Sequence, residues 1–483
     1  MELRDDTTPP GSTMHFTDRG HSPRVVLFST SLAVFAVFLD TTIGFVSFPA
    51  ISATFHHSGS DTLSWVLNAY TLVFAAMLVP AGRLADRIGR RRMFLLGVVV
   101  FTCGSMLCGL SPTVAVLIVA EMLEALGAAI LVPASLALVL QTFPKERIPV
   151  AVAIWGAIGA AAGAAGPTIG ALVVSNLSWR WAFFINLPVG IISFTLGRAV
   201  LPEGRERNPG RLPDAWSLVA LVAGVATVTY AIVESSHWGW GSVRFLAWIL
   251  TGAALVAAFV GRSRSVPNPV VRMELFGVRN FRWANTAMIV YAVGFNAMFL
   301  GNILFLTRVW HYSILRAGLA VSLGPLIVAT TAPRFGKLAG RIGQRRLLVP
   351  GGLLWVLGAG LLITRATTSP NYVGVYLPAI LCTAFGVATC LPQLSSAAVQ
   401  SLPPDQLGTG SAVGQSLRNL GSTFGVALVI AFTTGVTADS VLNSFHHVWL
   451  LLGGCGLGVS LLSTRLSGRP RTSTITSAVS PAN

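Results

Sequence analysis

The stretch GRLADRIGRRRM, residues 82–93, returns 254 residues later as GKLAGRIGQRRL, residues 336–347. Each copy lies between two long apolar runs and combines glycines with several basic residues. A single loop of this kind can be a plain positive-inside anchor, and that interpretation stays open. Duplicated halves of equal topology, however, are how many carriers build a central site. The repeat therefore predicts a membrane protein made of two related halves.

Composition places the chain in a membrane. Hydrophobic residues make up 53% of the 483 residues and charged residues 10%, which excludes an ordinary soluble protein. The net charge of +16 is spread over short loops, so nucleic acid is not an expected partner. All five cysteines fall in apolar runs without CxxC pairs, and we interpret them as small buried hydrophobes rather than metal ligands.

Fourteen apolar runs are long enough to cross a lipid bilayer, which takes about 20 residues each. With the N-terminus in the cytoplasm, the inner segments hold 27 of the 33 Lys and Arg residues and the outer segments hold five. The positive-inside rule therefore predicts that both termini are cytoplasmic. The remaining basic residue, Arg418, lies inside a span.

The sequence carries no motif for nucleotide binding or catalysis. The pattern G-x-x-x-x-G-K-[ST] is absent, and so are H-E-x-x-H and any Ser-His-Asp or Cys-His arrangement. The loops are too short for a soluble domain that could signal. We therefore expect no enzyme, no catalytic residue, no cofactor and no use of ATP, so that any uphill transport must draw on an ion gradient.

Several motifs resemble those of the major facilitator superfamily. GRLADRIGRRR is similar to that family's loop between the second and third helices. FLDTTIGFVSFPAI (38–51), WRWAFFINLPVG (179–190) and the segment 391–428 around Arg418 are similar to motifs of the fourteen-helix drug:proton antiporters, the multidrug efflux type. The resemblance runs from about residue 25 to residue 465. It implies a proton-coupled exporter of amphipathic drugs, antiseptic cations or antibiotics.

The resemblance also implies the fold: an all-α integral membrane protein with 14 transmembrane helices, arranged as two pseudo-symmetric six-helix bundles with two inserted helices. The expected organisation is a disordered cytoplasmic tail (1–24), an N-terminal six-helix bundle (25–200), two extra transmembrane helices (215–261), a C-terminal six-helix bundle (283–463) and a second cytoplasmic tail (464–483).

The loop motif is expected to act as a conformational latch. Its glycines allow a tight turn, and Asp86 can pair with Arg83 or Arg90. In the family this cluster holds the outward-open state, and the resemblance extends that role to Gly82, Arg83, Asp86, Arg87, Gly89 and Arg90. The second copy has Gly340 where the first has Asp86, so only the first half is expected to form the latch.

A glycine-rich run, GAIGAAAGAAGPTIG, occupies residues 156–170 of the fifth span. Its glycines recur every three or four residues, which predicts one face for close helix packing. The resemblance to the antiporter motif G-x-x-x-G-P-x-x-G adds a role in conformational change for Gly163, Gly166, Pro167 and Gly170. A role in packing alone stays open.

Three carboxyl groups lie deep within spans: Asp40, Glu121 and Glu124. A charge at mid-membrane costs about 2.5 to 3.5 kcal/mol, so these groups must face protein or a water-filled cavity, or be protonated. Helix rise places Asp40 and Glu121 at a similar depth. Carboxyls close together in a low-dielectric site cannot all ionise, so at least one is expected to hold a proton, as a proton-coupled exporter requires.

The fourth span departs from the family pattern R-x-x-q-G-x-g-a-A. Here it reads EMLEALGAA, with Glu121 replacing the Arg and Glu124 replacing the Gln. Proton coupling that uses this Arg would therefore have to use a different set of residues here, and Arg418 is a possible substitute as the counter-charge. The plainer interpretation is that both Glu residues are protonated and hydrogen-bond neighbouring helices.

Three functions remain open at this point. The favoured one is a proton-driven exporter of small amphipathic compounds in the cell membrane, which we expect to be the inner membrane of a bacterium. The others are a dedicated exporter of one self-made metabolite or lipid-like molecule, and a passive facilitator.

Overall fold

The computed structural model describes residues 23–144, 147–203, 214–267, 269–403, 406–434 and 440–467. Within these ranges the chain contains no strand, and 14 helical spans are long and apolar enough to cross a membrane. The predicted all-α membrane fold is therefore confirmed. The tails predicted at 1–24 and 464–483 lie outside the described residues, apart from 23–24 and 464–467.

The first half contains α1 (Pro23–Thr54), α2 (Ser60–Ile88), α3 (Arg90–Leu110), α4 (Val114–Thr142), α5 (Ile148–Asn176), α6 (Trp179–Phe184) and α7 (Asn186–Val200). Two further helices follow, α8 (Ala215–Trp238) and α9 (Val243–Ser265). The second half contains η2 (Met273–Gly277), α10 (Arg279–Arg308), α11 (Ile314–Ile342), α12 (Arg345–Arg365), η3 (Tyr372–Tyr376), α13 (Leu377–Val399), α14 (Leu407–Thr433) and α15 (Val441–Ser463).

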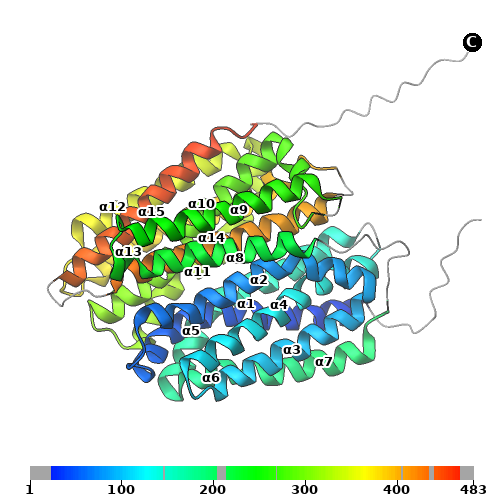
Figure 1. Cartoon of the computed structure of the whole chain (residues 1–483), viewed down its shortest axis with the longest axis horizontal. Coiled ribbons are helices and arrows are strands. Elements are labelled where there is room, and N and C mark those ends of the chain that lie inside the picture. Colours follow the sequence, from blue (N-terminus) through cyan, green and yellow to red (C-terminus); the bar gives the residue numbers. More distant parts are fainter. Residues whose placement is uncertain are drawn as a thin grey trace, which may run out of the picture.

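The helices of each half pack mainly on one another. In Figure 1 the blue and cyan helices of the first half lie on one side, and the yellow, orange and red helices of the second half lie on the other. The green helix α8 contacts α2 and α14, so it packs against both halves, and α9 packs on α8. At their adjoining ends Arg262 donates two hydrogen bonds to Asp214, which hold the pKa of that carboxyl well below its usual range.

The sixth span is broken into α6 and α7 at Ile185. Pro188 explains the break, because it has no N–H to donate to the carbonyl of Phe184 four residues earlier. The break puts Asn186 at the start of α7, deep in the bundle and fully buried. The break therefore places the polar side chain of Asn186 in the interior of the helix bundle.

Helices α3 and α4 approach each other unusually closely at three glycines. A Cβ at Gly97 would lie 2.8 Å from the backbone nitrogen of Leu131, and one at Gly104 would lie 2.6 Å from that of Glu124. A Cβ at Gly127 would meet the backbone of Phe101. The absence of side chains at these positions therefore sets the distance between the helices and fixes where Glu124 lies.

We expect Gly104→Ala to lower the stability of the protein by about 1 to 3 kcal/mol, because the added methyl overpacks a backbone contact that cannot yield locally. The matched control is Gly360→Ala in α12, where a Cβ would meet nothing within 4 Å. There the gain in helix propensity should leave stability unchanged or slightly higher. Thermal unfolding in detergent measures both, and equal midpoints for the two variants would contradict this packing.

Candidate functional site

Two helices, α1 and α4, place three carboxyl groups in the interior of the first half. Asp40 lies on α1, and Glu121 and Glu124 lie one turn apart on α4. Their exposed fractions are 7%, 5% and 0%, so none of them faces lipid. The two Glu side chains are three residues apart and share a broad helix face, as their spacing predicts.

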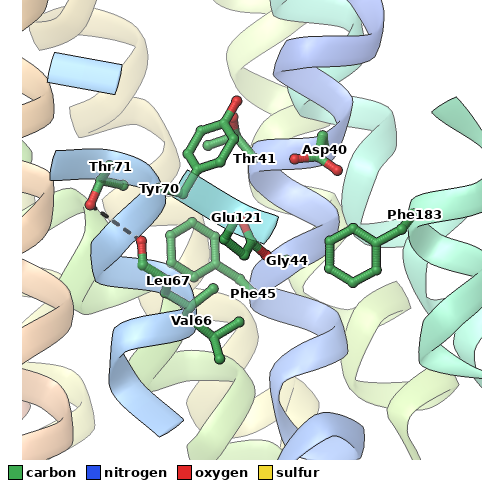
Figure 2. A pocket seen from close by; sticks show the side chains of 10 residues that line it. All are labelled: Asp40, Thr41, Gly44, Phe45, Val66, Leu67, Tyr70, Thr71, Glu121 and Phe183. Carbon is green, nitrogen blue, oxygen red and sulfur yellow. Dashed lines mark hydrogen bonds between the residues drawn. The ribbon is translucent and has the colours of Figure 1, made fainter. Parts of the chain in front are cut away.

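Asp40 and Glu121 line one small cavity (Figure 2). Residues of α1 and α2 form most of its wall, including Phe45, Tyr70 and Thr71. Its volume is about 20 Å³, which suits about one water molecule and is far below the several hundred Å³ that an organic ligand needs. The structure therefore shows the site closed, and a ligand can enter only when helices move apart.

Asn186 joins two of the carboxyls. Its Nδ2 lies 3.0 Å from Oδ1 of Asp40 and 3.4 Å from Oε1 of Glu124, and 2.9 Å from Oγ of Ser105. An amide nitrogen has two hydrogens, so these three acceptors compete for two donors. A change in the charge of one carboxyl therefore changes the hydrogen bond available to the other.

The two Glu residues have different surroundings. Glu121 lines the cavity, and no hydrogen bond to its side chain is formed within the described residues. Glu124 is sealed behind the cavity, where it accepts from Asn186 and from the thiol of Cys108, with Sγ 3.4 Å from Oε2. Glu121 can thus contact a molecule that enters the cavity, whereas Glu124 is linked to the cavity only through the hydrogen bonds of Asn186.

No basic side chain in the described part of the chain forms a salt bridge with Asp40, Glu121 or Glu124. Arg418, suggested by the sequence as a substitute counter-charge, lies on α14 in the second half and does not pair with them. The hydroxyl of Tyr70, which lines the same cavity, is buried. The cluster is therefore acidic and lacks a protein cation in this conformation.

The loop motif forms one of the two ion pairs that the sequence allows. Asp86 accepts from Arg90, with Nη2 at 2.9 Å and Nε at 3.0 Å, rather than from Arg83. Arg90 also donates to Oε1 of Gln141 at the end of α4, at 3.3 Å. Gly89 has φ of 129°, which a side chain would strain.

The remaining residues of the predicted latch are placed around this ion pair. Gly82 faces Pro133 of α4, Arg83 is half-buried, and Arg87 is exposed. In the second copy Gln344 takes the position of Arg90 and donates to Ser396 at the end of α13, at 2.9 Å. Both halves thus tie this loop to the equivalent helix, but the described second copy has no ion pair.

The glycine-rich helix α5 differs from the single packing face that the sequence predicts. Gly159, Gly166 and Gly170 face α1, whereas a Cβ at Gly156 or Gly163 would meet nothing within 4 Å. Glycines spaced three and four residues apart spread over an arc of about 80° around the helix axis. The glycines at the two edges of this arc therefore meet different surroundings. The prediction of one close-packed face is wrong for Gly156 and Gly163.

Helix α5 meets α11 of the other half through residues in the second half of α5 and the first half of α11. Thr168 donates to Ser322 at 2.7 Å, and Gly318 lies against the carbonyl of Pro167 and the methyl of Ala171. These residues are near the end of α5 and the start of α11. These contacts therefore join the two halves toward the end of α5 that is remote from the loop motif.

Sequence reasoning missed Asn186, Ser105 and Cys108 as partners of the carboxyls. Asn186 gave a signal, since an amide within an apolar run, here two residues before Pro188, is costly without a partner. Ser105 and Cys108 gave none, because small polar residues are common in spans. The cysteines were predicted to be buried, which holds for Cys108 but is wrong for Cys103, whose side chain is exposed.

Comparisons with known proteins agree with this architecture. The family model described as Major Facilitator Superfamily matches residues 30–426. The multidrug resistance protein Stp of Mycobacterium tuberculosis is 35% identical over 406 residues, covering 84% of this chain and 75% of that protein. The tetracenomycin C resistance and export protein of Streptomyces glaucescens is 29% identical over 420 residues, covering 84% and 75%.

Solved structures share the fold at low sequence identity. An auto-inhibited peptide transporter of the POT family matches with a TM-score of 0.67 and 16% identity, covering 93% of this chain and 98% of that one. A bacterial homologue of the lysosomal transporter Spinster, solved in an inward-facing and unoccupied conformation, matches with a TM-score of 0.62 and 14% identity, covering 92% and 97%.

Proposed function

This chain belongs to the major facilitator superfamily, and on that premise we propose that it exports amphipathic organic compounds across the plasma membrane in exchange for protons. The observation that carries the proposal is the buried cluster of Asp40, Glu121 and Glu124, with which no basic side chain of the described residues forms a salt bridge. Relatives named for multidrug resistance and for antibiotic export support the substrate class.

The proposed exchange follows from charge balance. Neighbouring carboxylates in a site of low dielectric repel one another, so the empty cluster retains at least one proton. A cationic substrate in the opened cavity supplies the missing positive charge and allows that proton to leave. Protons that return from the outside then displace the substrate, and no nucleotide is needed.

Alternating access gives each step a direction. With both termini in the cytoplasm, the end where α5 meets α11 is the outer end, and the loop motif lies at the inner end. The pairs Thr168–Ser322 and Thr71–Thr423 then close the outer side between the halves. This arrangement supports a form that is closed on the outer side, so that a substrate enters from the cytoplasm or the inner leaflet once the helices move apart on the inner side.

A dedicated exporter of one metabolite is the second candidate. It is favoured by the relative named for tetracenomycin C, whose name describes resistance to and export of a single compound. The two candidates share the site and the coupling, and they differ only in the range of compounds accepted.

The test is efflux of ethidium in everted membrane vesicles that contain the protein, with and without a proton gradient. We expect ethidium to accumulate in the vesicles when the gradient is present and to leak back when a protonophore collapses it. Ethidium that only equilibrates across the vesicle membrane, at a rate that does not depend on the gradient, would contradict antiport and indicate a passive facilitator. Failure to move ethidium, with gradient-dependent movement of another compound, would favour the dedicated exporter.

A further inference from the structure

Arg418 lies in the middle of α14 with its charge unsatisfied by the protein. Its side chain is half-buried and forms no hydrogen bond or salt bridge within the described residues, although its carbonyl accepts from Ser422. A guanidinium at this depth is costly without a partner, and Arg is suited to bind planar oxyanions. The partner must therefore be something that enters from outside the fold.

The surroundings of Arg418 are polar and also unsatisfied. Helix α10 packs against α14 at this level, where Gly421, one turn after Arg418, lies against Ala292, the neighbour of Tyr291. Tyr291 is 1% exposed, and its hydroxyl has no hydrogen-bond partner in the described part of the chain. Asn285, also 1% exposed, has a free Oδ1 facing Gly414, one turn before Arg418. Nδ2 of Asn419 is buried and, like that Oδ1, has no hydrogen-bond partner among the described residues. Buried polar atoms in proteins are rarely left unpaired, so this group is typical of a binding site without its ligand.

A row of aromatic rings links this group to the acidic cavity. Tyr291 stacks on Phe295 with centroids 5.8 Å apart, Phe295 lies 6.1 Å from Phe299, and Phe299 lies 5.4 Å from Phe45. Phe45 lines the cavity beside Asp40 and Glu121 (Figure 2). From Tyr291 to Phe299 the row spans about 12 Å along α10 at 1.5 Å per residue.

We propose that Arg418 and Tyr291 form an anion-accepting subsite, so that the transported molecule is amphoteric: an elongated aromatic compound with an amine at one end and a carboxylate or similarly acidic group at the other. The amine is placed at Asp40 and Glu121, the aromatic body along Phe299 and Phe295, and the acidic group at Arg418. The placement of the amine at Asp40 and Glu121 rests on the proposed function, whereas the placement of the acidic group at Arg418 does not.

The experiment measures equilibrium binding of norfloxacin, which carries both an amine and a carboxylate, and of its methyl ester, which lacks the anion. The purified full-length protein in detergent is the sample. We expect the wild type to bind the acid at least about tenfold more tightly than the ester, as a charged hydrogen-bonded pair provides. In Arg418→Gln the ratio of the affinities for acid and ester should fall to about one, because only the acid pairs with the guanidinium.

Two further variants separate a subsite from a structural role. Tyr291→Phe keeps the ring stack and removes only the hydroxyl, so it should reduce the acid-to-ester ratio without changing binding of the ester. Arg244→Gln, which removes an exposed arginine at the start of α9, should leave the ratio unchanged.

A ratio near one in the wild type, binding of neither compound, or the same ratio in wild type and Arg418→Gln would overturn the subsite. These results are independent of proton coupling. A protein that shows the ratio but moves no compound against a gradient would retain the subsite and lose the proposed antiport.

Discussion

Asp40→Asn should reduce gradient-driven ethidium efflux in everted vesicles by about 100-fold or more. The substitution keeps the shape of the side chain and its contact with Asn186, but it removes a charge that the substrate needs and a site that the proton needs. Because Asp40 lines the cavity, both losses occur at the point where substrate and proton compete. Downhill leakage of ethidium through the protein should change much less than uphill transport.

The control for Asp40→Asn is Glu274→Gln, which removes an exposed carboxyl in η2 outside the spans and should leave efflux unchanged. Expression and thermal unfolding of the two variants should be similar to wild type. Full gradient-driven efflux by Asp40→Asn would mean that the proton site lies elsewhere.

Asn186→Leu should lower efflux by about tenfold or more, because Asp40 and Glu124 then lose the donor that they share. The amide donates to the carboxylate form, so its removal favours the protonated form and should move the pH dependence of transport toward higher pH. A purely structural role would reduce the amount of folded protein without moving that profile. The measurement is therefore efflux per folded molecule as a function of external pH.

Asn186→Gln tests the same idea from the other direction. It keeps the donor but displaces it by one methylene, so partial efflux with a smaller shift of the pH profile is expected. An unchanged pH profile in Asn186→Leu would show that Asp40 and Glu124 are not linked through this amide.

The fold was predictable from the sequence because its determinants are local. Apolar runs of sufficient length, the distribution of basic residues and the repeat at 82–93 and 336–347 are visible without any knowledge of contacts. The break at Ile185 also has a local cause in Pro188, but a hydropathy pattern counts apolar residues and passes over a missing N–H.

The site was only partly predictable from the sequence. The depth of each carboxyl in the membrane follows from its position along its own helix, whereas its hydrogen-bond partners depend on how other helices pack against it. Helix rise brought Asp40 and Glu121 to one level, and the structure places both at one cavity. The separation of Glu121 from Glu124 depends on the close approach of α3 at Gly104 and on the position of Asn186, which come from other helices. The residue spacing within α4 carries no information about the approach of α3 or the position of Asn186.

The most direct test of exchange at the carboxyl cluster is proton release from the purified protein in weakly buffered detergent when ethidium is added, followed with a pH indicator. We expect wild type to release protons in proportion to the ethidium bound. Asp40→Asn combined with Glu124→Gln should bind ethidium more weakly and release few or no protons per ethidium bound. Ethidium binding by wild type without proton release, or equal release by the double variant, would contradict exchange of a proton for a substrate at this cluster.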